Sequence, residues 1–452
     1  MIPPDFTLSV SEEISIVESS TLTSNIGDED WFPHFSDGSG GNYGIVVANF
    51  GQDSSFAGNK TAQGNQDGNG IGDFYYTPPT GYLALCNENL PDDNTFELDT
   101  GEKPSDHFNI LTYSGTGVNP TSHTGVGFQP DFVWLKARNA ADNHPVFDAI
   151  RGAGEVIYTN TNDAEGTTSH FISFDSDGFT TTADSAYNSA SRTYVAWCWK
   201  ANGTGVSNTN GDITSTVSAN TTAGFSIVSY TGATNSTSDS SNNGGSYWTI
   251  GHGLTKAPEL IIVKKRSSAA SWYVGSDYLG GTTPWADGKH LTLNTTASVA
   301  NEDPDGILWG NTAPTSSVFT VGGWDVVNRN GSTYISYCFH SVDGYSKVGS
   351  YTGNGSTDGP FVYTGFRPAC IIYKKTSGTA DWHIYDNKRD AYNVADSCLF
   401  PSGSYNDQTG DALDFLSNGF KQRNTGSEAN ASGSSYIYIA FAEVPTKFSN
   451  GR

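Results

Sequence analysis

The chain has 452 residues, enough for two to four ordinary domains and too many for one compact β core. It carries 23 Lys and Arg against 47 Asp and Glu, a formal net charge of −24. Such a surface repels nucleic-acid phosphate and anionic lipid, so neither nucleic-acid binding nor attachment to an anionic membrane is expected.

The composition favours β-structure. A single Met and 15% charged residues accompany 52 Gly and 13% aromatic residues. Helical proteins rely on Ala, Leu, Glu, Lys and Met, whereas Gly-rich turns and β-branched or aromatic residues are typical of sheets. We therefore predict an all-β protein of tandem β-sandwich-like modules with an irregular, partial sandwich N-terminal region. No run approaches the ~18 apolar residues of a transmembrane helix, so membrane insertion is not expected.

Residues 1–105 form the first predicted region, since they lack the landmarks that recur later. The start Met-Ile-Pro-Pro has neither the basic residues nor the apolar run of a signal peptide, which favours synthesis in a cytoplasm. The cysteines are odd in number and scattered, which favours buried thiols, with a Cys370–Cys398 bridge as the alternative. They are Cys86, Cys198, Cys338, Cys370 and Cys398.

A possible calcium loop lies in this first region. Asn65, Asp67, Asn69 and Asp73 supply oxygens at positions one, three, five and nine of an EF-hand-like pattern with Gly at six. Position twelve, however, is Tyr76 instead of a bidentate Glu. Asn-Gly and Asp-Gly are also common in hairpin turns. A turn is the favoured interpretation, and Ca²⁺ is the one cofactor that the sequence suggests as an alternative.

Three later segments carry the same landmarks in the same order, which predicts repeats at 106–200, 201–344 (after a linker) and 345–452. Each has a strand ending in Tyr-(Ser/Thr)-Gly, a Gly-hydrophobic-Pro turn, an apolar strand ending in Lys, and a closing aromatic strand. The residues are Tyr113 to Gly115, Tyr230 to Gly232 and Tyr351 to Gly353; Pro130, Pro258 and Pro368; Lys136, Lys264 and Lys374; and closing strands from Tyr194, Tyr334 and Tyr438.

These landmarks predict local structure. We expect the Gly to form a turn after the first strand, the Pro to begin a strand, and the Lys at the strand end to reach solvent. Segments of this length with short strands are typical of β-sandwiches, so the three repeats should follow one another as separate beads along the chain. The polar stretch 200–212 is either a flexible linker or an extended strand laid along a neighbour.

Catalytic motifs are not evident. The sequence lacks a Gly-x-Ser-x-Gly elbow, a His-Glu-x-x-His pair and a phosphate-binding loop, so an enzyme is not expected. Asp148, Asp277 and Asp386 recur at one repeat position, which points to a turn cap. A glycan depolymerase with paired carboxylates is the weaker of two functional alternatives.

Carbohydrate binding is the stronger alternative. Aromatic faces stack on sugar C–H surfaces while neighbouring polar groups bond the hydroxyls. The candidate residues are Tyr247, Trp248, Trp382 and Tyr385. Packing in the core or between subunits is the competing interpretation for each, and repetition favours it for Trp382.

The residues after the N-terminal stretch carry a family resemblance. Asn49 to Gln52, Tyr76 to Cys86 and Asn89 to Pro91 resemble the closing segment of SPRY-like (concanavalin-like sandwich) regions in bacteriophage virion proteins. Three later phrases resemble the tandem β-repeats that follow such regions in tail-fibre and appendage proteins, notably of marine and cyanobacterial phages. These are Phe225 to Gly232, Gly253 to Pro258 and Val348 to Gly355.

The resemblance implies a non-enzymatic structural protein of the virion, in a tail fibre or similar appendage that contacts the host surface. Its expected partners are further copies of itself, as a homotrimer or higher assembly that buries apolar strips, other virion proteins, and a host-surface glycan. Less chain precedes Asn49 than a whole SPRY sandwich needs. The N-terminal module is therefore expected to be truncated, restructured or completed by another subunit.

Overall fold

The computed structural model describes residues 60–80, 102–233, 247–285, 287–300 and 307–442, and in addition residues 54, 55, 58, 83 and 84. The chain divides into two compact units, residues 1–89 and 90–452. The described residues form 25 strands in six sheets, a 3₁₀ turn at Pro104–Asp106 and the helix α1 (Asp325–Asn328). The all-β prediction is therefore confirmed. No helix in these residues is long and apolar enough to cross a membrane.

The described part of the first unit, between residues 54 and 84, is irregular. An isolated antiparallel bridge joins Asn65 to Phe74. Residues 49–52 and 89–91, and part of 76–86, lie outside the described residues, so the SPRY-like resemblance stays a prediction.

The first repeat forms a large and a small sheet. The large sheet has the order β1 (Phe108–Ser114), β9 (Thr193–Trp199), β3 (Phe132–Ala137), β4 (Pro145–Asp148), β5 (Glu155–Tyr158) and β6 (Gly166–Thr167). The small sheet has the order β2 (Thr121–Thr124), β8 (Gly178–Thr181) and β7 (Phe171–Asp175). Successive residues of β3 point alternately into two apolar clusters, which explains its unbroken apolar run.

The second repeat also forms a large and a small sheet. The large sheet has the order β10 (Val206–Asn208), β11 (Ser215–Asn220), β12 (Phe225–Thr231), β18 (Thr333–Phe339), β14 (Leu260–Lys265), β15 (Trp272–Ser276) and β16 (Leu291–Thr292). Two of these strands, β10 and β11, are additional and precede β12. The small sheet has only two strands and pairs β13 (Trp248–Gly251) with β17 (Val318–Val321). Since β10 lies in the polar stretch 200–212 and pairs with β11, the extended-strand interpretation of that stretch is correct there.

The third repeat has the fewest strands of the three. Its large sheet has the order β19 (Ser346–Thr352), β25 (Ser435–Ala442), β21 (Pro368–Lys375) and β22 (Trp382–Asp386). Its small sheet has the order β20 (Phe361–Tyr363), β24 (Gly419–Gln422) and β23 (Leu413–Leu416). The order β1-β9-β3-β4 of the first repeat is matched by β12-β18-β14-β15 in the second and by β19-β25-β21-β22 in the third.

Strand register defines which residues are equivalent. Tyr113 lies opposite Tyr194 and Tyr230 lies opposite Tyr334. In the third repeat Tyr351 lies opposite Tyr436. The prediction that the closing strand begins its pattern at Tyr438 was therefore wrong by two residues, one full period of a strand. Both residues face the same side of the sheet, so the apolar pattern alone does not distinguish them.

The Gly after each first strand has a different role from the predicted turn. A Cβ on Gly115 would lie 2.0 Å from Ser189 O, and one on Gly232 or Gly353 would lie 2.3 Å from Arg329 O or Ala431 O. Glycine is therefore needed because another part of the backbone passes closely, three times at the same place.

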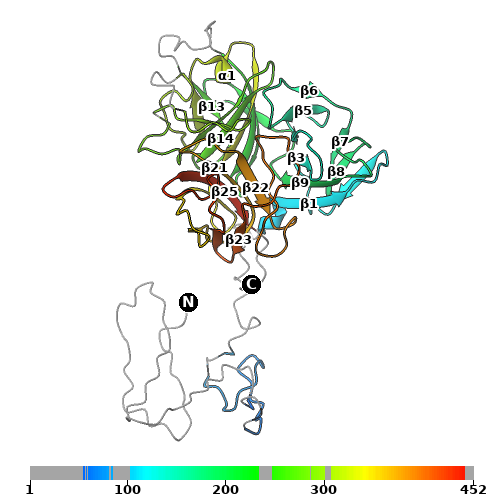
Figure 1. Cartoon of the computed structure of the whole chain (residues 1–452), viewed down its shortest axis with the longest axis vertical. Helices are drawn as coiled ribbons and strands as arrows, with labels where there is room; N and C mark the ends of the chain where they lie inside the picture. The colour runs from blue at the N-terminus through cyan, green and yellow to red at the C-terminus, as the bar shows by residue number, and fades with distance from the viewer. Residues whose placement is uncertain are drawn as a thin grey trace. The chain divides into compact units, whose positions relative to one another are not determined.

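The three repeats are not separate beads, because their large sheets share one apolar core. In Figure 1, β3, β14 and β21, one strand from each repeat, lie around the middle of this unit. The core leaves a void of only about 40 Å³ at its centre. Its buried members include Phe132, Trp134 and Trp197 from the first repeat, Leu260, Trp272 and Tyr337 from the second, and Ile372, Trp382 and Ile439 from the third. The prediction failed because sequence landmarks locate each module without revealing that its outward-facing apolar side chains meet those of the others.

Hydrogen bonds close the repeats into a ring. The second repeat bonds the first, the third bonds the second, and the first bonds the third. The bonds run from Trp272 Nε1 to Tyr158 O (2.9 Å), from Trp382 Nε1 to Thr292 O (2.9 Å), and from Thr159 Oγ1 to Pro401 O (3.0 Å).

The lysine at the end of each apolar strand is buried, contrary to the prediction that it reaches solvent. Lys136, Lys264 and Lys374 are each 0% exposed. The Lys264 ammonium donates to a carbonyl of the first repeat, and the Lys374 ammonium to one of the second. Burial lowers the pKa of all three to about 8. These strand ends lie where one repeat contacts the next, and the sequence of a single module does not reveal such contacts.

Candidate functional site

The proposed calcium loop has the interactions of a turn. Asp67 Oδ1 accepts the backbone N–H groups of Asn69 (2.9 Å) and Ile71 (3.0 Å), and Asp67 Oδ2 accepts that of Ala84 (2.7 Å). The Asn65 amide donates across the bridge to Phe74 O.

Two further side-chain oxygens of this loop accept hydrogen bonds. Asn65 Oδ1 accepts the Thr77 hydroxyl (3.2 Å). Asp73 Oδ2 accepts the N–H of Ser54 (3.1 Å). Within the described residues, no three His, Cys, Asp or Glu side chains are placed to hold a metal ion. The favoured turn interpretation accounts for Asn65, Asp67 and Asp73 without a metal, and calcium binding there stays a prediction.

Two of the four candidate carbohydrate-binding residues are buried. Trp382 is 3% exposed and Tyr385 is 0% exposed. Trp382 lies in the shared core, and the Tyr385 hydroxyl donates to Asp411 O. Neither ring can stack on a sugar, so this prediction was wrong for both. Strand β22 is covered on both faces, which its sequence Trp-His-Ile-Tyr-Asp does not indicate.

Tyr247 and Trp248 lie at the start of β13, at the surface of the second repeat. Tyr247 is 37% exposed, and its ring lies over Gly310. Trp248 is half-buried against the apolar cluster within the second repeat, which includes Ile250 and Phe319. Residues 234–246, which precede them, lie outside the described residues, so a sugar site formed by Tyr247 and Trp248 stays a prediction.

Two of the three recurring aspartates, Asp148 and Asp386, cap turns as predicted, and both also join repeats. Asp148 and Asp386 accept the backbone N–H three residues later and pair with Arg151 and Arg389, all four being buried. Asp148 also accepts the Tyr337 hydroxyl of the second repeat (2.8 Å), and Asp386 accepts Trp197 Nε1 of the first (3.1 Å).

The second repeat differs at this position. Asp277 has Gly280 three residues later instead of arginine, and it accepts the indole N–H of Trp285 from its own repeat (2.5 Å). These carboxylates therefore serve packing, and the arginines and aspartates of the first and third repeats face protein on all sides.

The thiols are also structural. Cys198, Cys338, Cys370 and Cys398 are buried and free, which confirms the thiol interpretation for them and excludes the Cys370–Cys398 bridge. Cys86 lies outside the described residues. Burial raises the pKa of all four thiols, so none is a ready thiolate nucleophile.

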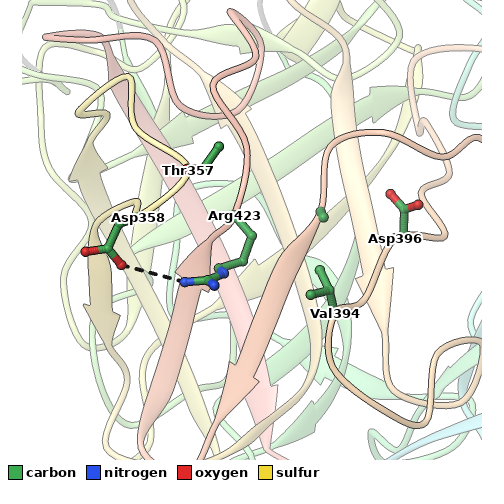
Figure 2. Close-up of a pocket in the computed structure, with 6 residues that line it drawn as sticks. Thr357, Asp358, Val394, Asp396 and Arg423 are labelled. Atoms are coloured by element: carbon green, nitrogen blue, oxygen red, sulfur yellow. Dashed lines mark ion pairs between the residues drawn. The ribbon is translucent and has the colours of Figure 1, made fainter.

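An open groove lies beside the small sheet of the third repeat (Figure 2). Its volume is about 530 Å³, and it lies between the segment before β20, the segment after β22, and the neighbouring ends of β23 and β24. The lining residues are Thr357, Asp358, Val394, Asp396, Ala412 and Arg423. We call it the third-repeat groove.

The charged side chains of the third-repeat groove are held in position. Asp358 pairs with Lys421 (2.5 Å) and with Arg423 (3.6 Å), and this second pair is drawn in Figure 2. Arg423 also pairs with Asp414 (3.3 Å). The hydrogen bond and positive charge of Lys421 lower the pKa of Asp358. The groove thus offers fixed donors and acceptors next to the apolar Val394 and Ala412.

The outer face of the same small sheet continues from the groove. Phe361 and Tyr363 lie on β20 at positions i and i+2, so they share one face. They are 48% and 64% exposed. Lys421 lies opposite Phe361 on β24, and Asp414 lies opposite Lys421 on β23. We call Phe361, Tyr363, Lys421 and Asp414 the third-repeat outer face.

The equivalent faces of the other repeats carry small residues, and Thr180, Thr320 and Gly251 on them are buried. The inward residues His123, Ile250 and Val362 lie opposite Phe179, Phe319 and Phe420, which sets the equivalence. The pair in the place of Phe361 and Lys421 is Ser122 with Thr180 in the first repeat and Thr249 with Thr320 in the second. Tyr363 is replaced by Thr124 and Gly251.

Comparison with known families gives one match. The family model described as "Domain of unknown function (DUF7483)" matches residues 103–445. The chain belongs to this family. The match begins next to the 3₁₀ turn and ends just after β25, so one DUF7483 domain contains all three repeats together with their shared core. Comparison with curated proteins gives no match.

Sequence reasoning missed the third-repeat groove and outer face of this DUF7483 domain. Its candidates for carbohydrate binding were Tyr247, Trp248, Trp382 and Tyr385. A signal was nevertheless present, because Phe361-Val-Tyr363 is a short alternating strand whose outward residues are aromatic. Recognising it as unusual required the register that aligns it with Ser122 and Thr249.

Proposed function

We propose that this DUF7483 protein is a non-enzymatic structural component of a bacteriophage virion, in a tail fibre or similar appendage that contacts the host surface. The observation that best supports the proposal is the closure of three sandwich-like repeats on one apolar core. Each repeat covers apolar surface that it would otherwise expose, so opening any one of them exposes its neighbours. A block of this kind resists unfolding and proteolysis, which suits a part that persists outside the cell.

The placement of the reactive groups supports the same proposal. The described thiols are buried, and the ion pairs Asp148–Arg151 and Asp386–Arg389 are enclosed within protein. These groups have packing roles that account for their burial. The sequence resemblance to tail-fibre and appendage proteins supplies the location in the virion, with synthesis in the host cytoplasm.

The test is mass spectrometry of purified particles of the phage that encodes the chain. We expect peptides from residues 103–445 in the particles at several copies each, retained after a high-salt wash. Peptides that occur in the infected-cell lysate and not in washed particles would overturn the proposal.

Self-association is a separate part of the proposal. The homotrimer was expected because small sandwiches leave apolar strips exposed, and the shared core covers those of the three repeats within one chain. Light scattering after size exclusion tests it. A mass of three or more chains that persists on dilution supports assembly with itself, whereas a monomer of 48.1 kDa removes self-association and leaves attachment to other virion proteins.

A further inference from the structure

The third repeat differs from the other two in the residues of its outer face, and the fold determines those residues only in part. Threonine, serine and glycine occupy the equivalent positions of the small sheet in the first and second repeats. The same positions in the third repeat carry Phe361, Tyr363 and Lys421. Since the sheet forms with small polar residues, the aromatic side chains are not needed to build it.

These aromatic side chains are also poorly placed for folding. Phe361 is 48% exposed and Tyr363 is 64% exposed, so each leaves a large apolar area in water. Adjacent exposed aromatic residues beside a groove are typical of ligand-binding surfaces. Two residues on one strand face are ~6.6 Å apart along the strand, so both rings can contact one extended ligand.

We propose that the third-repeat outer face and the third-repeat groove form a binding site for a neutral carbohydrate chain. Phe361 and Tyr363 provide the flat apolar faces that stack on sugar C–H surfaces. Asp358, Asp396 and Arg423 provide acceptors and donors for hydroxyl groups, and Val394 adds apolar surface to the lining. The groove volume of about 530 Å³ lies within the usual range of ligand sites.

The charges favour an uncharged ligand. The site carries three carboxylates, Asp358, Asp396 and Asp414, against Lys421 and Arg423. Both basic groups are already paired with Asp358. The whole chain is strongly negative at −24, which disfavours an acidic polysaccharide or a nucleic acid. Sugar hydroxyls both donate and accept, so they match a mixed lining of this kind.

This inference goes beyond the proposed function, since a structural subunit of a particle needs no sugar site. The two can fail separately. Presence of the chain in particles tests the first, and binding of the purified chain to glycans tests the second.

The experiment uses the labelled full-length chain on a glycan array that covers neutral hexose, pentose and N-acetylhexosamine oligosaccharides together with acidic ones. We expect binding to one or more neutral glycans. The double variant Phe361→Ser/Tyr363→Thr places the residues of the first repeat on the third and should weaken that binding about tenfold or more. Arg423→Ala should weaken it as well. Tyr76→Thr, an equally exposed tyrosine in the other unit, should leave it unchanged.

Several outcomes would overturn the proposal. Absence of binding to every neutral glycan would do so, as would binding that the double variant leaves unchanged. Binding to acidic glycans alone would contradict the charge argument. If the double variant changed the assembly mass while glycan binding stayed absent, the face would be a protein interface instead. Unchanged circular dichroism and melting temperature establish that each variant is folded.

Discussion

The interior frame of the repeats and the outer face of their small sheets differ in how much the three copies vary. In the interior, a stacked tyrosine pair recurs with ring centroids 5.0, 5.1 and 4.7 Å apart. A buried asparagine also recurs six residues before the second tyrosine, at Asn188, Asn328 and Asn430. On the outer face the third repeat alone carries aromatic and basic residues. Packing determines which residues stand in the interior frame, whereas the residues of the outer face can vary from repeat to repeat.

A change at the ring contacts should have the largest effect. Asp148→Asn removes the nearer carboxylate of the buried Arg151 and leaves only Glu165 (3.4 Å) to pair with it, and we expect a loss of about 3 kcal/mol in the free energy of unfolding. Urea denaturation followed by tryptophan fluorescence measures it. Asp277→Asn is the matched control, because Asp277 has no arginine three residues later and an amide oxygen still accepts the Trp285 N–H. Its expected loss is below about 1 kcal/mol. Equal losses would mean that the arginine adds nothing to the contact.

The recurring asparagine comes next. The Asn430 amide donates to Ser356 O and Asn424 O, both at 2.8 Å, and its oxygen accepts the N–H of Asn354 (2.8 Å). Asn430→Ala leaves these buried backbone groups without their hydrogen-bond partner. We therefore expect the free energy of unfolding, measured by urea denaturation, to fall by about 2–3 kcal/mol. Asn406→Ala, on an exposed loop, should change stability by less than about 0.5 kcal/mol. A small loss at Asn430 would show that water replaces the amide and that the recurrence has another cause.

The buried lysines make stability depend on pH. Their pKa of about 8 in the folded protein lies below the value of 10.5 for an ordinary lysine. The unfolded chain therefore holds more protons on these three lysines between pH 8 and 10, so their contribution to the free energy of unfolding rises with pH through that window. Their contribution is full above pH 10.5 and is lost as the pH falls through 8. The buried thiols, whose pKa is raised, contribute in the opposite direction.

The variant Lys374→Met removes one of three such groups, so the slope of the free energy of unfolding against pH between pH 8 and 10 should be lower in the variant than in the unchanged chain. Lys388→Met is the control, because Lys388 is exposed, and it should leave the slope unchanged. A slope that Lys374→Met does not alter would indicate that the ammonium reaches water.

Much of this frame could be predicted from the sequence. The Tyr, Gly and Pro landmarks gave the repeats and the all-β class, since they depend on local period and backbone sterics. Asn188, Asn328 and Asn430 share the spacing Asn-x₅-Tyr and could have been found in the same way. The burial of Lys136 and Trp382 could not be predicted from the sequence. It depends on contacts with other repeats, since Lys136 lies near Asp407 and Trp382 donates to Thr292 O. The third-repeat groove was hidden for the same reason, as Asp358, Asp396 and Arg423 meet only after the sheet has formed.

The smallest effect on stability is expected at the outer face, and it is the sharpest test of the comparison. Phe361→Ser/Tyr363→Thr removes two rings that are about half or more exposed, so little burial is lost and the free energy of unfolding should change by less than about 0.5 kcal/mol. The first repeat folds the same strand pair with Ser122 and Thr124. Urea denaturation of the full chain measures the change. A loss above about 2 kcal/mol would mean that the rings stabilise the third repeat, in which case their difference from the other copies reflects folding and not binding.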